Sequence, residues 1–141
     1  MYGKCSTACI QGIDGVLVHA EADLTNGLPQ FAIVGLPDSA VREAAERVRA
    51  ALRNSGYEFP LRRITVNLAP ADVRKEGASF DLAIAACLLL ASRQWPQELA
   101  EGTLFLGELG LSGDVRAVPG VLPMALAARE AGLSQIGRAH V

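Results

Sequence analysis

The stretch ITVNLAPADVRKEGASFDLAIAACLLLA, residues 64–91, decides the fold of this chain. At its start, apolar residues at positions 64, 66 and 68 alternate with polar ones, which predicts a strand. Pro70 ends this strand because proline lacks a backbone donor, and the charged residues 71–78 predict a loop. From Phe80 to Ala91 apolar residues follow almost without interruption, which indicates a helix covered on every side. The rest of the chain must therefore wrap around this helix.

The composition bounds the class of protein. The chain has 141 residues, 50% of them hydrophobic and only 5% aromatic, which predicts a single domain with an aliphatic core. A net charge of -2 gives no global attraction to nucleic acid or to an anionic membrane. The longest apolar run, residues 82–91, is too short to span a bilayer, and no signal peptide is evident. We therefore expect a cytoplasmic protein without a membrane partner.

The cysteines and histidines argue against a disulfide framework or a zinc site. Cys5, Cys9 and Cys87 form no CxxC pair, and the chain has only two histidines. We expect three reduced thiols, with Cys87 a small core residue of the central helix. His19 falls on the polar side of a predicted strand and is expected at the surface.

The remaining periodicities predict an α+β domain. Residues 5–11 and 16–23 form a hairpin through the turn at 12–15, and residues 31–34 add a third strand. Asp38 is a suitable N-cap for a helix that ends near residue 54. Strands are expected at 103–106 and 115–118, and a last helix at 120–131. The expected order is a three-strand meander followed by helix–strand–helix–strand–helix, with the helices packed on one sheet.

The last six residues, IGRAHV at 136–141, do not follow this pattern. The codons ATC GGA AGA GCA CAC GTC encode the hexapeptide and match a common sequencing-adapter read. We therefore expect a C-terminally truncated domain over residues 1–135, an artefact over 136–141, no strand after Gly132, and no role for His140.

Ser79 is the sharpest candidate for chemistry in the chain. It precedes the buried helix, where backbone N–H groups could hold an oxyanion. Such a serine is a nucleophile if a base activates it, and is otherwise an ordinary N-cap. By contrast, Gly35-Leu36-Pro37 lacks the GxxxxGK[ST] and GxGxxG patterns, which favours a tight turn over nucleotide binding.

Four cations flank the central strand and are candidates for contact with nucleic acid or an acidic partner. Arg62 and Arg63 precede the strand, while Arg74 and Lys75 follow it, roughly 20 Å away along an extended path. No aromatic residue interleaves with them, so a stacking platform for single strands is not expected. Ordinary solvated charge is the alternative interpretation.

Taken together, several short motifs resemble a known family. They are VGLPD at 34–38, NLAPAD at 67–72, KEG at 75–77, FDL at 80–82, GEL at 107–109 and GVLP at 120–123. In this combination, residues 4–132 resemble the N-terminal domain of ComM-type (YifB-type) proteins, bacterial AAA+ ATPases similar to the magnesium chelatase ATPase subunit. The resemblance implies a ribosomal-protein-S5-domain-2-like fold, which the Lon protease domain shares.

The resemblance also implies a function for the longer parent protein. ComM-type proteins act as hexameric, ATP-driven motors that promote DNA branch migration in natural transformation. Their ATP and Mg²⁺ belong to an AAA+ module with Walker motifs that this chain lacks, so no cofactor or metal is expected here. The implied partners are that module and neighbouring subunits, with DNA as a further candidate.

The likeness to Lon bears directly on Ser79. Lon uses a Ser–Lys dyad, and its KDGPSAG motif aligns Ser79 with the nucleophile. Its GGVKEK-like segment aligns Leu122 with the lysine, and leucine cannot accept a proton. We therefore expect a noncatalytic accessory domain. Two alternatives remain: a Ser–Lys peptidase with a base from elsewhere, and a direct DNA-binding module that uses the four cations.

Overall fold

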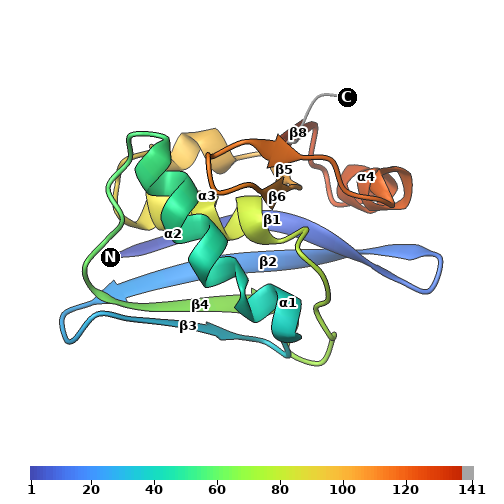
Figure 1. The fold of residues 1–141 in the computed structure, drawn as a ribbon. Helices are drawn as coiled ribbons and strands as arrows, with labels where there is room; N and C mark the ends of the chain where they lie inside the picture. The colour runs from blue at the N-terminus through green and yellow to red at the C-terminus, as the bar shows by residue number, and fades with distance from the viewer. Residues whose placement is uncertain (138–141) are drawn as a thin grey trace.

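The computed structural model describes residues 1–137 as a mixed six-stranded sheet with helices packed on both faces (Figure 1). The α+β class and the predicted order of the main elements are confirmed. The elements are β1 (Tyr2–Gln11), β2 (Asp14–Thr25), β3 (Gln30–Val34), α1 (Ser39–Arg42), α2 (Ala44–Asn54), β4 (Arg63–Ala69), α3 (Asp81–Ala91), a 3₁₀ helix η1 (Gln97–Ala100), β5 (Thr103–Phe105), β6 (Glu108–Leu109), β7 (Val115–Arg116), α4 (Val121–Glu130) and β8 (Gln135–Gly137).

The order of the strands corrects the meander predicted from the sequence. β1 and β2 form the expected antiparallel hairpin, but the full sheet order is β3-β4-β2-β1-β5-β8. β4 therefore lies between β2 and β3, antiparallel to the first and parallel to the second. Parallel neighbours require a crossover, which α1 and α2 supply. A central place also buries Ile64, Val66 and Leu68 of β4, which an edge would leave half covered.

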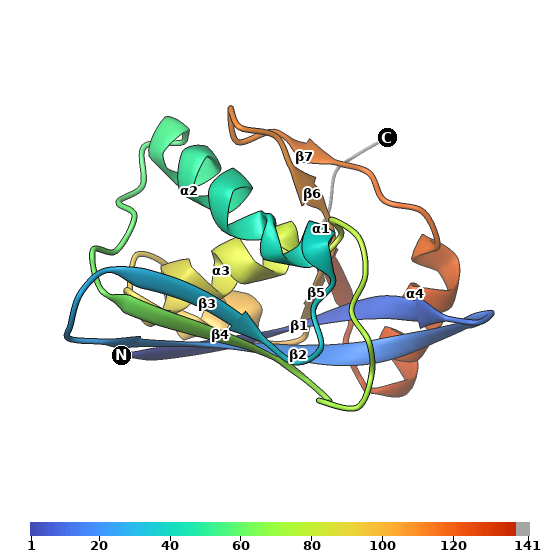
Figure 2. The same cartoon turned by 60° about the horizontal axis from the view of Figure 1, so that its bottom comes forward.

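The helix α3 is the centre of the main core, as predicted. Every residue of α3 except Leu82 is buried. One side of α3 packs on β1 and β2, while α2 covers another side (Figures 1 and 2). α2 turns Val48 and Leu52 toward this core, while its charged residues Glu46 and Arg53 are exposed. The prediction of a helix covered on all sides is confirmed.

The opposite face of the sheet carries α4 (Figure 2). Successive residues of a strand point to opposite faces, so Ala8 lies in a second apolar cluster although its neighbour Cys9 faces the main core. Met124 and Ala128 of α4 complete this second cluster together with Leu104 of β5. Two layers of helix therefore enclose the β1–β2 hairpin.

Two short strands escape prediction from the sequence. The stretch 107–113, expected to be a turn, contains β6, which pairs with β7. The expectation of no strand after Gly132 is wrong, because β8 adds to the sheet edge by parallel pairing with β5. A strand of three residues at an edge is held by main-chain pairing, which hydrophobic periodicity does not report. Residues 138–141, including His140, lie outside the described residues.

Candidate functional site

Ser79 lies in a cleft of about 520 Å³ where the two layers meet. The end of β1 forms one wall, the loop before α3 a second, and the segment after β7 a third. The lining residues are Cys9, Ile10, Gln11, Gly12, Arg74, Glu76, Gly77, Ala78, Ser79, Glu108, Ala117, Val118, Pro119 and Met124. The position predicted for a nucleophile is therefore accessible from a formed cleft.

Ser79 is fixed in this cleft by its backbone. Its carbonyl oxygen accepts a hydrogen bond from the N–H of Gly107 over 3.2 Å. The helix-capping position belongs to Phe80, and no side-chain cap bond forms at the start of α3. The interpretation of Ser79 as an ordinary N-cap is therefore wrong, and its half-buried side chain faces the cleft instead.

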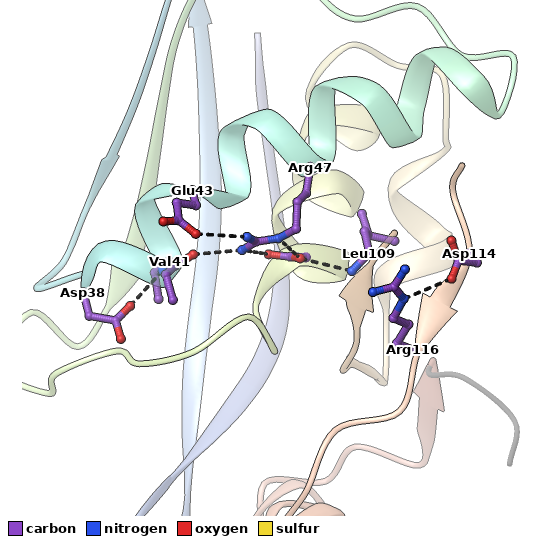
Figure 3. Close-up of polar contacts among 9 residues, drawn as sticks. Asp38, Val41, Glu43, Arg47, Leu109, Asp114 and Arg116 are labelled. Atoms are coloured by element: carbon purple, nitrogen blue, oxygen red, sulfur yellow. Dashed lines mark hydrogen bonds and ion pairs between the residues drawn. The ribbon is translucent and has the colours of Figure 1, made fainter. Parts of the chain in front are cut away.

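An ion pair holds the first turn of α3 directly after Ser79. Asp81 is fully buried, and its carboxylate accepts from Nε of Arg47 over 2.6 Å and from Nη2 over 3.0 Å. Its Oδ2 also accepts from the N–H of Leu109 over 3.1 Å. Figure 3 shows Arg47 extending from α2 between Glu43 and Leu109. Burial raises the pKa of Asp81, while these hydrogen bonds act against the rise.

The cap of α1 also ties down the loop before Ser79. Asp38 Oδ1 accepts from the N–H of Val41 over 2.8 Å, as predicted for an N-cap (Figure 3). Its Oδ2 accepts from the N–H of Gly77 over 3.1 Å. One carboxylate therefore joins the start of the α1–α2 arm to the loop that carries Ser79.

Lys75 is the amine nearest to Ser79 in sequence, but it is buried and directed elsewhere. Its side chain is completely covered, and its Nζ donates to the carbonyl oxygen of Pro70. Burial lowers the pKa of Lys75, against the opposing charge effects of Cys9 and Asp72. Lys75 does not line the cleft. It is accordingly neither an exposed contact for nucleic acid nor a hydrogen-bond partner of Ser79.

Leu122, aligned with the Lon lysine, does not reach the cleft either. It lies on the outer side of α4 and is 71% exposed, whereas the α4 residue that lines the cleft is Met124. A thioether cannot serve as a general base at neutral pH. The α4 wall of the cleft is therefore chemically inert.

The four predicted cations do not form one surface. Arg74 lies at the Ser79 cleft, 3.4 Å from Glu76, and Lys75 is buried. Arg63 is exposed at the start of β4, next to the buried Ile64, so it lies on the solvent face of the sheet. Arg62 is in the loop before β4, among residues that sequence reasoning missed: Arg49 and Arg53 of α2 and the ring of Phe59. The spacing of four between the two α2 arginines is the signal that would have found them.

Neither a metal site nor a membrane segment is evident in the described part of the chain. Among residues 1–137, no three His, Cys, Asp or Glu side chains gather as metal ligands. No helix in that range combines the length and apolarity that a membrane crossing requires.

Comparison with known proteins places these features in a family. A family model described as subunit ChlI of Mg-chelatase matches residues 20–137. Competence protein ComM of Haemophilus influenzae is 49% identical over 119 residues, 84% of this chain and 23% of that protein. YifB of Salmonella typhimurium is 47% identical over 126 residues, 89% of this chain and 25% of YifB. A Lon protease of Mycolicibacterium smegmatis is 27% identical over 146 residues, 95% of this chain and 18% of that protease.

The match covers only part of each relative. The chain spans about a quarter of the length of ComM and YifB. The matched residues include the Ser79 loop, the segment after β7 and α4, which line the cleft, while the wall formed by the end of β1 precedes the matched range. The chain belongs to the family of the magnesium chelatase subunit ChlI and is homologous to part of ComM and YifB.

Proposed function

We propose that this chain is a noncatalytic N-terminal accessory domain of a ComM-type AAA+ ATPase. Its role is to pack against the ATPase module and neighbouring subunits and to regulate the ATPase ring. The observation that carries the proposal is that, among the described residues, neither a lysine nor a histidine lines the Ser79 cleft. Leu122 points outward and the Lys75 amine is bonded to Pro70, so neither of them is placed to accept the Ser79 proton as a dyad lysine would.

The relation to Lon gives this observation its weight. The chain is 26–27% identical to two Lon proteases. The resemblance to Lon implies a Ser–Lys dyad in those enzymes. A serine hydroxyl without a neighbouring base is a weak nucleophile at neutral pH. A Ser79 cleft that no lysine lines favours a scaffold over a Ser–Lys peptidase.

The activity of the longer protein is part of the proposal. We propose that it is cytoplasmic and hexameric, uses ATP and Mg²⁺ in its AAA+ module, and drives DNA branch migration in natural transformation. Support comes from the relative named competence protein ComM and from the family model. None of these steps is assigned to residues of the present chain.

Two assays on the purified chain test the accessory role. ATP hydrolysis and hydrolysis of an unstructured protein substrate are measured for the wild type and for Ser79→Ala. We expect both rates to equal the buffer rate for both proteins. Substrate hydrolysis by the wild type that Ser79→Ala abolishes would contradict the noncatalytic assignment, as would ATP hydrolysis that copurifies with the chain.

A further inference from the structure

Two guanidinium groups stack on one aromatic ring, and a third arginine lines the same hollow, at the end of the sheet remote from the hairpin turn of β1 and β2. The Arg49 guanidinium carbon lies 4.9 Å from the centre of the Phe59 ring, and that of Arg53 lies 5.9 Å away. Arg62 follows three residues after Phe59 and lines the same hollow. We call Arg49, Arg53, Phe59 and Arg62 the arginine surface.

No ion pair neutralises the charges of the arginine surface within the part of the chain that the structure describes. Within residues 1–137, the ion pairs shorter than 4.0 Å involve other arginines. Nε of Arg49 is buried without a hydrogen-bond partner, and Arg62 donates only to the neutral amide of Asn26, over 3.1 Å. Glu46 of α2 and Glu58 beside Phe59 are the nearest carboxylates along the chain. Neither pairs with the three arginines, although the chain as a whole is acidic.

The surroundings of these arginines are shaped to receive a ligand. Two hollows, of about 110 and 680 Å³, adjoin the segment at 59–62, and both are lined by Arg53, Phe59 and Arg62. Leu61, which also lines both hollows, is 75% exposed. Both hollows therefore open beside the same three side chains.

The chemistry of the arginine surface selects the ligand. A guanidinium stacked on a ring keeps its N–H edges free, and these edges match the oxygens of a phosphate in bidentate fashion. The Phe59 ring already contacts Phe31, with ring centres 5.9 Å apart, and two guanidinium groups. It therefore orients arginines and does not offer a free face for a base.

We propose that the arginine surface binds the phosphodiester backbone of a nucleic acid without reading its sequence. The loop between α2 and β4, which carries Phe59 and Arg62 of this surface, lies at the opposite end of the molecule from α4 (Figure 1). The proposal is independent of Ser79, so either inference can fail while the other stands.

The test is binding of a fluorescent oligonucleotide by the whole chain, followed by anisotropy across a salt series. The variant Arg49→Gln/Arg53→Gln/Arg62→Gln is compared with Lys4→Gln/Arg42→Gln/Arg129→Gln, which removes three exposed charges elsewhere. We expect the first variant to lose roughly tenfold or more in affinity. The slope of log affinity against log salt concentration, measured on a single strand, should become shallower by about 2. We expect the second to lose less than about threefold. An equal loss in both variants would overturn the proposal.

A second pair of variants avoids dependence on the packing of Arg49 and Arg53 on Phe59. Leu61→Glu places a carboxylate on the arginine surface, and Ile13→Glu places one at the 90% exposed tip of the hairpin. Leu61→Glu should weaken binding several-fold, with Ile13→Glu close to wild type. The reverse order would overturn the proposal, and so would tighter binding of a polyglutamate peptide than of the oligonucleotide, which would identify an acidic-protein site.

Discussion

Arg47 donates two hydrogen bonds to Asp81, through Nε at 2.6 Å and Nη2 at 3.0 Å, and thereby joins α2 to the first turn of α3. The pair is enclosed: the Asp81 side chain has no exposed area and that of Arg47 is 19% exposed. A buried pair is costly to break because one charge is left without a partner. The position of Ser79, two residues before Asp81, depends on this contact.

Asp81→Asn should therefore lower the free energy of unfolding by about 3–5 kcal/mol. The exposed pair of Asp114 and Arg116, drawn beside it in Figure 3, supplies the matched control. Asp114→Asn should have little measurable effect because water screens exposed pairs. Urea unfolding of the two variants makes the comparison, and equal losses would show that the Arg47–Asp81 pair does not hold α3.

The pH dependence of one surface contact can be stated with its sign. Tyr2 Oη donates to Glu21 Oε2 over 2.5 Å, and this bond raises the pKa of Tyr2 from 10.0 to about 12. Because the folded state holds the proton more tightly, the contact stabilises the fold below pH 10.0. That stabilisation is lost as the pH rises through about 12.

An absorbance titration of tyrosinate in the folded chain checks this prediction. The signal that disappears in Tyr2→Phe should have its midpoint near 12 in the wild type. In Glu21→Gln the same midpoint should move back toward 10.0, since the acceptor charge is gone. An unchanged midpoint would mean that Glu21 is not the cause of the shift.

The docking of α4 on the hairpin gives a third prediction. A Cβ on Gly15 would overlap the backbone of Pro123 and Met124, whereas one on Gly12 would meet no atom within 4 Å. Gly12 instead has a φ of +67°, which an L residue adopts at a cost of about 1 kcal/mol. Gly15→Ala should therefore lower the free energy of unfolding by about 2 kcal/mol or more, and Gly12→Ala should lower it by less. The measurement is the denaturant midpoint of each variant, compared at an unchanged m-value. A larger loss in Gly12→Ala than in Gly15→Ala would show that α4 does not pack closely on Gly15.

The elements with a strong period were predictable from the sequence. The alternation of β4, the unbroken apolar run of α3 and the Asp38 cap are all present in the structure. Strand order was not predictable, because pairing of β4 between β2 and β3 depends on burial of the whole sheet. β6 and β8 depend on main-chain pairing with a partner distant in sequence, which a local pattern does not encode.

The sequence predicted where the candidate site lies, but not which side chains surround it. Ser79 lies in a cleft, as a serine at the start of a buried helix suggested. The burial of Lys75 was not foreseen, because a charged loop residue is normally solvated. The association of Arg62 with Phe59 and two arginines of α2 is likewise a tertiary contact that spacing along the strand does not reveal.

The outward position of Leu122 leads to a prediction about restoring a base. Since Leu122 is 71% exposed and does not line the cleft, Leu122→Lys should fold normally and leave Ser79 unreactive. Lys75→Met, which removes the buried amine but keeps much of its volume, should also leave reactivity at Ser79 unchanged. The comparison uses labelling by a fluorophosphonate probe, and an increase in Leu122→Lys would show that the two positions approach each other in solution.

The most direct measurement is the intact mass of the wild-type chain after incubation with that fluorophosphonate across neutral and mildly alkaline pH. An inert serine predicts no added mass in the wild type and an identical result for Ser79→Ala. Stoichiometric addition to the wild type, located at Ser79 by peptide mapping and absent from Ser79→Ala, would contradict the account and identify an active nucleophile.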